Sequence, residues 1–92
     1  MDVPPAGFVR EALCIHHWET RGHPDPGAWH LDTGNGQSGG LQFSHYTWRS
    51  VGGRGEAWMA SRREQIYRAW VVYLRDGRSW REWTTAPLCH LR

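Results

Sequence analysis

The sequence predicts a small α+β protein that is mainly α-helical, with a short hairpin-like insert between its first two helices. Apolar residues recur at helical spacing near the N-terminus. Ser61-x-x-Glu64 is a capping box of the kind that opens a long helix. A glycine-rich stretch from Asp32 to Phe43 separates these regions and cannot continue a helix. The 92 residues suffice for one domain, residues 1–92, and leave no room for a second.

The first helix is expected from about Pro5 to Thr20. Its inward stripe follows helical spacing, at Phe8, Ala12 and Ile15. The segment R-G-H-P-D-P-G should end it, because two prolines and two glycines cannot continue a helix.

Two short extended pieces, Trp29–Leu31 and Leu41–Phe43, are expected on either side of the glycine loop. Ser44 should cap a short helix through Trp48, which Gly52-Gly53 stops. The longest helix is expected over about Arg62–Asp76, and Gly77 terminates it. Its predicted inward face contains Ile66, Ala69, Trp70 and Tyr73.

The glycine loop satisfies two familiar patterns that the rest of the chain excludes. Gly34, Gly36 and Gly39 spell G-x-G-x-x-G, but no βαβ unit surrounds them and the chain is too short for that fold. Asp32 opens the D-T-G of aspartic proteases, which require a largely β dimer that the helical signals contradict. The simpler interpretation is a turn in which Asn35 and Gly36 adopt left-handed backbone angles.

Composition limits the partners and the location. A net charge of +2 gives no argument for nucleic acid, and no apolar run has the length of a membrane span. The start M-D-V-P-P-A-G lacks the profile of a signal peptide, which predicts an intracellular chain, a fragment, or a protein released by lysis or within a virion. All eleven basic residues are Arg, which suggests a GC-rich genome such as that of an actinobacterium or its phage.

Cys14 and Cys89 lie near opposite ends and lack metal-site spacing. They are either two buried thiols or a disulfide, which would stabilise the fold by roughly 4–5 kcal/mol in the loop-entropy model. The disulfide would imply an oxidising destination rather than the cytosol.

Glu19 is a carboxylate in an unusual place. It continues the apolar stripe of the first helix, four residues after Ile15, and should face the interior or a cleft beside Trp18. Burial would raise its pKa, as a general acid near neutral pH requires. The alternative is a fraying terminal residue that reaches solvent.

Four stretches together resemble the catalytic domain of resuscitation-promoting factors: I-H-H-W-E-T-R-G, W-H-L-D-T-G-N-G-Q-S-G-G-L-Q-F-S-H-Y-T-W, A-S-R-R-E-Q-I and W-R-E-W-T-T-A-P-L-C. The resemblance runs from about Cys14 to Cys89. It implies a lysozyme-like fold with one disulfide, and cleavage of peptidoglycan glycan strands by a muramidase or lytic transglycosylase reaction. It implies no cofactor.

The resemblance makes Glu19 the catalytic acid, places Thr47 and Asp76 along the substrate groove, and pairs Cys14 with Cys89. The chain departs from the family in three places. Cys14 precedes Glu19 by five positions, whereas many family members place the cysteine directly before the glutamate. The segment His23–Ala28 lengthens the path after Glu19, and Gln37 and Ser38 replace paired aromatic residues in the glycine loop.

Seven Trp exceed what a core of this size needs. Flat aromatic faces suit sugar rings, so the candidate groove walls are Trp18, Trp29, Trp48 and Tyr46, with core packing as the alternative. The glycine-rich backbone near Gln42 would let glycan approach closely. Asp32 is the candidate second carboxylate, either catalytic or holding the turn through its side chain.

Two other classes of function compete with this prediction. A non-catalytic peptidoglycan-binding module would keep the groove and leave Glu19 idle. A metal enzyme would use His16 and Glu19, three apart on one helical face, but H-E-x-x-H is absent and the other histidines scatter over loops; no metal is expected. The protein is expected to be a monomeric domain, either alone or within a larger protein or virion. It is expected to act outside the cell, at the cell wall, or as part of a virion.

Overall fold

The computed structural model describes residues 3–92. Met1 and Asp2, the first two residues of the stretch compared above with a signal peptide, lie outside the described residues. The α-helices of this part are α1 (Ala6–Glu19), α2 (His45–Ser50) and α3 (Arg62–Arg75). The strands β1 (Gln37–Ser38) and β2 (Phe43–Ser44) form an antiparallel pair. Single turns of 3₁₀-helix occur at Gly27–His30, Ala57–Met59 and Ala86–Cys89. The prediction of a mainly helical α+β fold is confirmed.

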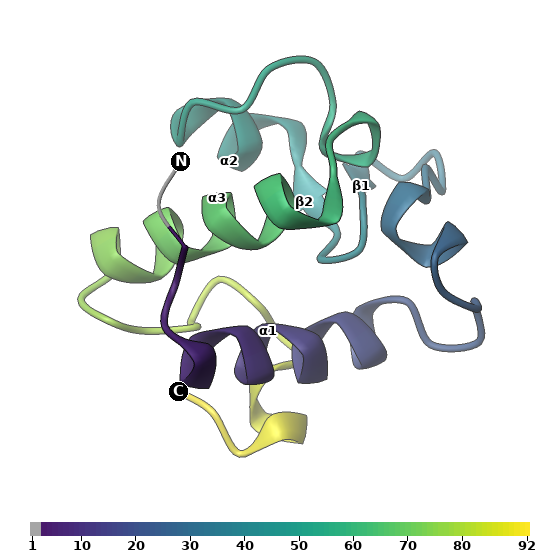
Figure 1. Ribbon diagram of the computed structural model, residues 1–92. Helices are drawn as coiled ribbons and strands as arrows, with labels where there is room; N and C mark the ends of the chain where they lie inside the picture. The colour runs from purple at the N-terminus through teal and green to yellow at the C-terminus, as the bar shows by residue number, and fades with distance from the viewer. Residues whose placement is uncertain (1–2) are drawn as a thin grey trace.

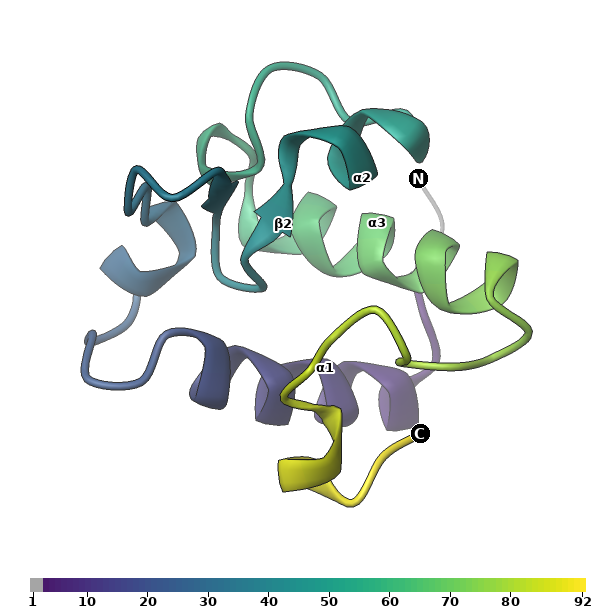
Figure 2. The ribbon, with the colours of Figure 1, turned by 180° about the vertical axis from the view of Figure 1, so that it is seen from behind.

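The two long helices form the centre of the molecule. Figures 1 and 2 show α1 beside α3, with α2 and the short sheet on the far side of α3. The tail after α3 returns to α1, and its 3₁₀ turn at Ala86–Cys89 packs on that helix. The C-terminal tail therefore packs against the N-terminal helix.

Both long helices follow the predicted boundaries to within one residue. In α1, Phe8, Ala12 and Ile15 are buried, as their spacing predicts. In α3, the Ser61 hydroxyl accepts a hydrogen bond from the Glu64 amide at 3.1 Å, as expected for a capping box. The helix α2 begins after Ser44, whose hydroxyl accepts from the Thr47 amide at 3.1 Å.

The predicted strand at Trp29–Leu31 is wrong. The Trp29 amide donates to the Pro26 carbonyl at 3.1 Å, so the backbone curls into a 3₁₀ turn over Gly27–His30. The predicted extended piece at Leu41–Phe43 is right only for Phe43. Gln42 has a φ of 51° and its amide bonds to Gly39, which places Leu41 and Gln42 in a turn. The hairpin is therefore built within the glycine loop itself.

Aromatic side chains make up much of the core. The rings of Phe8 and Trp80 stack with centroids 4.7 Å apart, and Phe43 meets Trp48 and Trp83 edge-on. The indole N–H of Trp80 donates to Glu11 Oε1 at 2.8 Å, which ties the tail to α1. Among residues 3–92, no helix combines the length and apolar character needed to cross a membrane.

The cysteines form a disulfide between Cys14 on α1 and Cys89 on the last 3₁₀ turn. This confirms the predicted disulfide and excludes the alternative of two free thiols. The link closes a loop of 75 positions, a length for which the constraint on the unfolded chain is large.

Candidate active site

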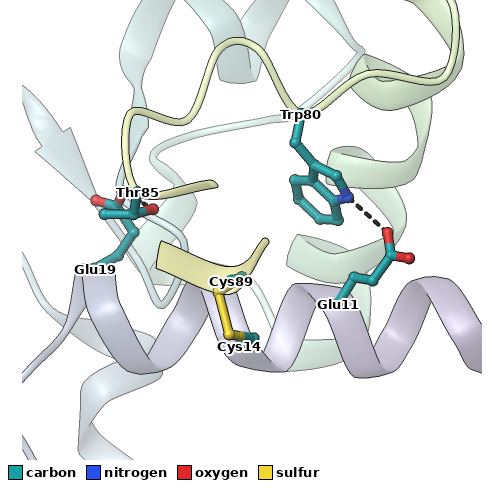
Figure 3. Close-up of a disulfide and its surroundings, with 6 residues drawn as sticks. All are labelled: Glu11, Cys14, Glu19, Trp80, Thr85 and Cys89. Carbon is teal, nitrogen blue, oxygen red and sulfur yellow. Dashed lines mark hydrogen bonds between the residues drawn. A yellow bond between two sulfur atoms is a disulfide. The ribbon is translucent and has the colours of Figure 1, made fainter. Parts of the chain in front are cut away.

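Glu19 is the last residue of α1 and is half-buried. Its Oε2 accepts a hydrogen bond from the Thr85 hydroxyl at 2.8 Å (Figure 3). Thr85 belongs to the tail and is 66 positions away in sequence. Since the side chain is held by this contact, Glu19 is not the fraying terminal residue of the alternative interpretation.

Burial raises the pKa of Glu19 above its ordinary value, and the hydrogen bond from Thr85 acts in the opposite direction. Burial has the larger effect because moving a carboxylate out of water disfavours its charged form. A carboxyl group in this state keeps its proton to a higher pH than a solvated glutamate. This is the property that a general acid needs.

The end of α1 that carries Glu19 is anchored to the glycine loop. The two ring nitrogens of His16 lie 2.7 Å from two acceptors, the Gly40 carbonyl and Asp25 Oδ1. Gln65, fully buried on α3, completes the anchor. Its amide nitrogen donates to the Trp29 carbonyl at 2.8 Å, and its oxygen accepts from the Gly40 amide at 2.8 Å.

A small cavity of about 60 Å³ lies between the hairpin and the tail. It brings together the predicted groove residues Gln42 and Thr47, with Glu82 and Trp83 of the tail. Its remaining lining comes from the hairpin, at Gln37, Phe43 and Ser44. Glu19 is not among the lining residues, so a groove that joins this cavity to Glu19 stays a prediction.

Glu82, which lines this cavity, forms an acidic pair with Asp76. The Asp76 side chain is 7% exposed, and its Oδ1 lies 3.8 Å from Arg75 and 3.4 Å from Arg81. A hydrogen bond with Asp76 raises the pKa of Glu82, burial and the charge of Asp76 add to this, and Arg75 opposes it. Asp76 Oδ2 is buried without another partner, so a protonated Glu82 can supply the missing donor. Glu82 lines the cavity and Asp76 does not, so the groove position expected for Asp76 stays a prediction.

The tryptophans expected in the groove behave differently from one another. Trp29 and Trp48 are 2% and 0% exposed, respectively, which matches the core-packing alternative and leaves no ring face for a sugar. Trp29 stacks on His16 at 4.0 Å. Trp18 is half-buried, and Tyr46 is 82% exposed, so these two remain available to a ligand.

Asp32 holds the glycine loop through its side chain. Its Oδ1 accepts from the Gly34 amide at 3.2 Å, and its backbone forms an antiparallel bridge with Ser38. Asp32 also lines a separate cavity of about 280 Å³, together with Glu56 and Trp58. The sequence left two roles open for Asp32, catalysis and holding the turn, and these contacts support the second.

Three polar residues of this region were missed by the sequence analysis: Thr85, Glu82 and Gln65. Gln65 occupies a buried position on the helical stripe of α3, and a polar residue on an apolar stripe was the available signal. Thr85 and Glu82 lie in an aperiodic tail, which offers no such signal.

The residues of the proposed metal alternative are engaged elsewhere. His16 bonds to Gly40 and Asp25, and Glu19 bonds to Thr85. Among residues 3–92, no group of three His, Cys, Asp or Glu side chains is placed to hold a metal ion.

A half-buried glutamate that ends the first helix, beside a glycine-rich hairpin and under a disulfide-linked tail, defines a small lysozyme-like domain. The sequence model of the transglycosylase-like domain family matches residues 17–86, and the chain belongs to this family. The matched region contains Glu19, Thr47 and Thr85.

Curated relatives confirm the resemblance to resuscitation-promoting factors. The chain is 46% identical over 80 residues to resuscitation-promoting factor Rpf of Micrococcus luteus, covering 86% of this chain and 34% of that protein. It is 46% identical over 67 residues to RpfE of Mycobacterium tuberculosis, covering 72% of this chain and 36% of that protein. With RpfC of the same species it shares 52% identity over 72 residues, covering 66% of this chain and 51% of that protein. The chain thus spans a third to a half of the length of these relatives.

Proposed function

We propose that this chain cleaves the glycan strands of peptidoglycan, with Glu19 as the general acid. The observation that carries the proposal is the half-buried Glu19, whose pKa burial raises and whose Oε2 is held by Thr85. Membership of the transglycosylase-like domain family supports it. Its substrate would place the protein at the cell wall, outside the cell or as part of a virion.

In the proposed reaction, Glu19 donates its proton to the glycosidic oxygen as the bond from that oxygen to C1 breaks. The resulting carboxylate then accepts a proton from the nucleophile that attacks C1. If the nucleophile is the C6 hydroxyl of the same sugar, the product carries a 1,6-anhydro ring, as in lytic transglycosylases. If it is water, the product carries a reducing end, as in a muramidase.

The remaining groove residues serve binding in this proposal. Gln42 and Thr47 lie at one cavity with Glu82, and Tyr46 presents an exposed ring on the same short helix as Thr47. Polar groups next to flat aromatic surface suit the rims and faces of sugar rings. Asp32 keeps the glycine loop in shape through the Gly34 amide.

Mass spectrometry of the products released from purified actinobacterial peptidoglycan tests the proposal. We expect soluble muropeptides, and their anhydro or reducing ends assign the reaction type. The competing function is a peptidoglycan-binding module without turnover. The buried Trp29 and Trp48 offer no stacking surface to either function, so they do not separate the two. Retention of the protein on the polymer without product release would identify that module.

A further inference from the structure

The contact between Glu19 and Thr85 depends on a segment that the disulfide ties to α1. Cys14 lies on the same helix as Glu19, and Cys89 follows Thr85 after only Ala86, Pro87 and Leu88. Figure 3 shows the disulfide and the pair Glu19–Thr85 along the same stretch of α1. The tail is therefore linked covalently to α1 only four positions after Thr85.

We propose that Thr85 is a positioning residue for Glu19, and that the Cys14–Cys89 disulfide holds Thr85 in that position. This inference rests on the proposed function, in which Glu19 delivers the proton. The hydroxyl of Thr85 occupies one carboxyl oxygen, Oε2, and leaves Oε1 as the oxygen that can carry a proton toward a substrate. The disulfide then acts on the site as well as on the stability of the fold.

The charged groups of α1 and the tail do not account for the shifted pKa of Glu19. On α1, the His16 ring is directed to Gly40 and Asp25, and Glu11 accepts from Trp80. In the tail, no acidic or basic residue occurs between Trp83 and Cys89. Only burial and the Thr85 hydrogen bond shift the pKa of Glu19.

A carboxylate accepts a hydrogen bond more strongly than a neutral carboxyl group does, so the Thr85 hydroxyl favours the ionised form of Glu19. Removing only this hydroxyl should raise the titration midpoint of Glu19. Thr85→Val keeps the shape of the side chain and removes the donor, and Thr85→Ser keeps the donor. Thr84→Val is the matched control, because Thr84 is exposed and is the neighbouring residue.

The titration of the Glu19 carboxyl carbon, followed by NMR, tests the first half of the proposal without requiring activity. We expect the midpoint to rise in Thr85→Val and to stay at the parent value in Thr85→Ser and Thr84→Val. The basic limb of the activity profile should move in the same direction. A Thr85→Val midpoint equal to the parent value overturns the positioning role, whether or not the chain cleaves glycan.

The role of the disulfide is tested by repeating the comparison in the variant Cys14→Ala/Cys89→Ala, which lacks it. The quantity measured is the difference in the Glu19 titration midpoint between this variant with Thr85 and the same variant with Thr85→Val. We expect the difference to shrink, because the tail no longer holds the hydroxyl at Oε2. An undiminished difference overturns the role of the disulfide. If this variant does not fold, two glycines inserted between Pro87 and Leu88 keep the disulfide but lengthen its link to Thr85. The same shrinkage is then expected, and an unchanged difference again overturns the role.

Discussion

Gly40 lies directly against the indole of Trp29, so that a Cβ at this position would overlap the ring and approach His16 Nδ1 to 2.8 Å. The glycine loop, the 3₁₀ turn at Gly27–His30 and the end of α1 meet at this contact. Gly40 is therefore needed for close packing at this position.

We expect Gly40→Ala to lower the free energy of unfolding by about 2–3 kcal/mol, since the added methyl must displace a buried indole. Urea unfolding followed by tryptophan fluorescence measures this loss. Gly27→Ala is the matched control, because a Cβ there meets nothing within 4 Å. Its effect should stay within about 0.5 kcal/mol. Equal stabilities of the two variants would contradict the packing role of Gly40.

The pair Asp76–Glu82 predicts a specific pH dependence of stability. The folded state raises the pKa of Glu82, so the protonated carboxyl contributes stability that is lost as the pH rises from about 4.5 through the folded-state value. Glu82→Gln is neutral at every pH and can still donate to Asp76. Its stability relative to the parent should therefore increase as the pH rises through that window.

Thermal unfolding of the parent and Glu82→Gln at a series of pH values measures this change. Below the window, Glu82 is protonated in both the folded and unfolded states, and the difference between the two proteins should be constant. A difference that stays constant across the whole range would show that Glu82 does not share a proton with Asp76.

For Asp32, the Gly34 hydrogen bond predicts a structural role. Asp32→Asn retains the side-chain oxygen that accepts from Gly34, so product type should be unchanged and the rate should fall less than about threefold. Mass spectrometry of released muropeptides measures both. Loss of reducing ends, or a fall of about a hundredfold in rate, would instead assign Asp32 to the reaction.

The elements that sequence reasoning located are those whose signals are local. The capping box at Ser61 and the stripe through Phe8, Ala12 and Ile15 each act within a few residues, and both helices begin and end within one residue of the prediction. The strand predicted at Trp29 failed because the residue is held by tertiary contacts, with His16 on its ring and Gln65 on its carbonyl.

The same distinction applies to the site. The partial burial of Glu19 could be predicted because a carboxylate on an apolar stripe is visible in the helical period. Thr85 was missed because it reaches Glu19 from 66 positions away through an aperiodic tail. Burial of Trp29 and Trp48 was equally beyond prediction, since an aromatic residue suits a core and a sugar groove alike.

The central claim is that Glu19 supplies the proton, and the turnover of peptidoglycan by Glu19→Gln tests it most directly. Gln can still accept from Thr85, and it replaces a partly desolvated carboxylate with a neutral group, so the fold should be retained at neutral pH. We expect release of muropeptides to fall by at least about a hundredfold while the circular dichroism spectrum and the disulfide are unchanged. Turnover by a folded Glu19→Gln protein at the parent rate would contradict the account.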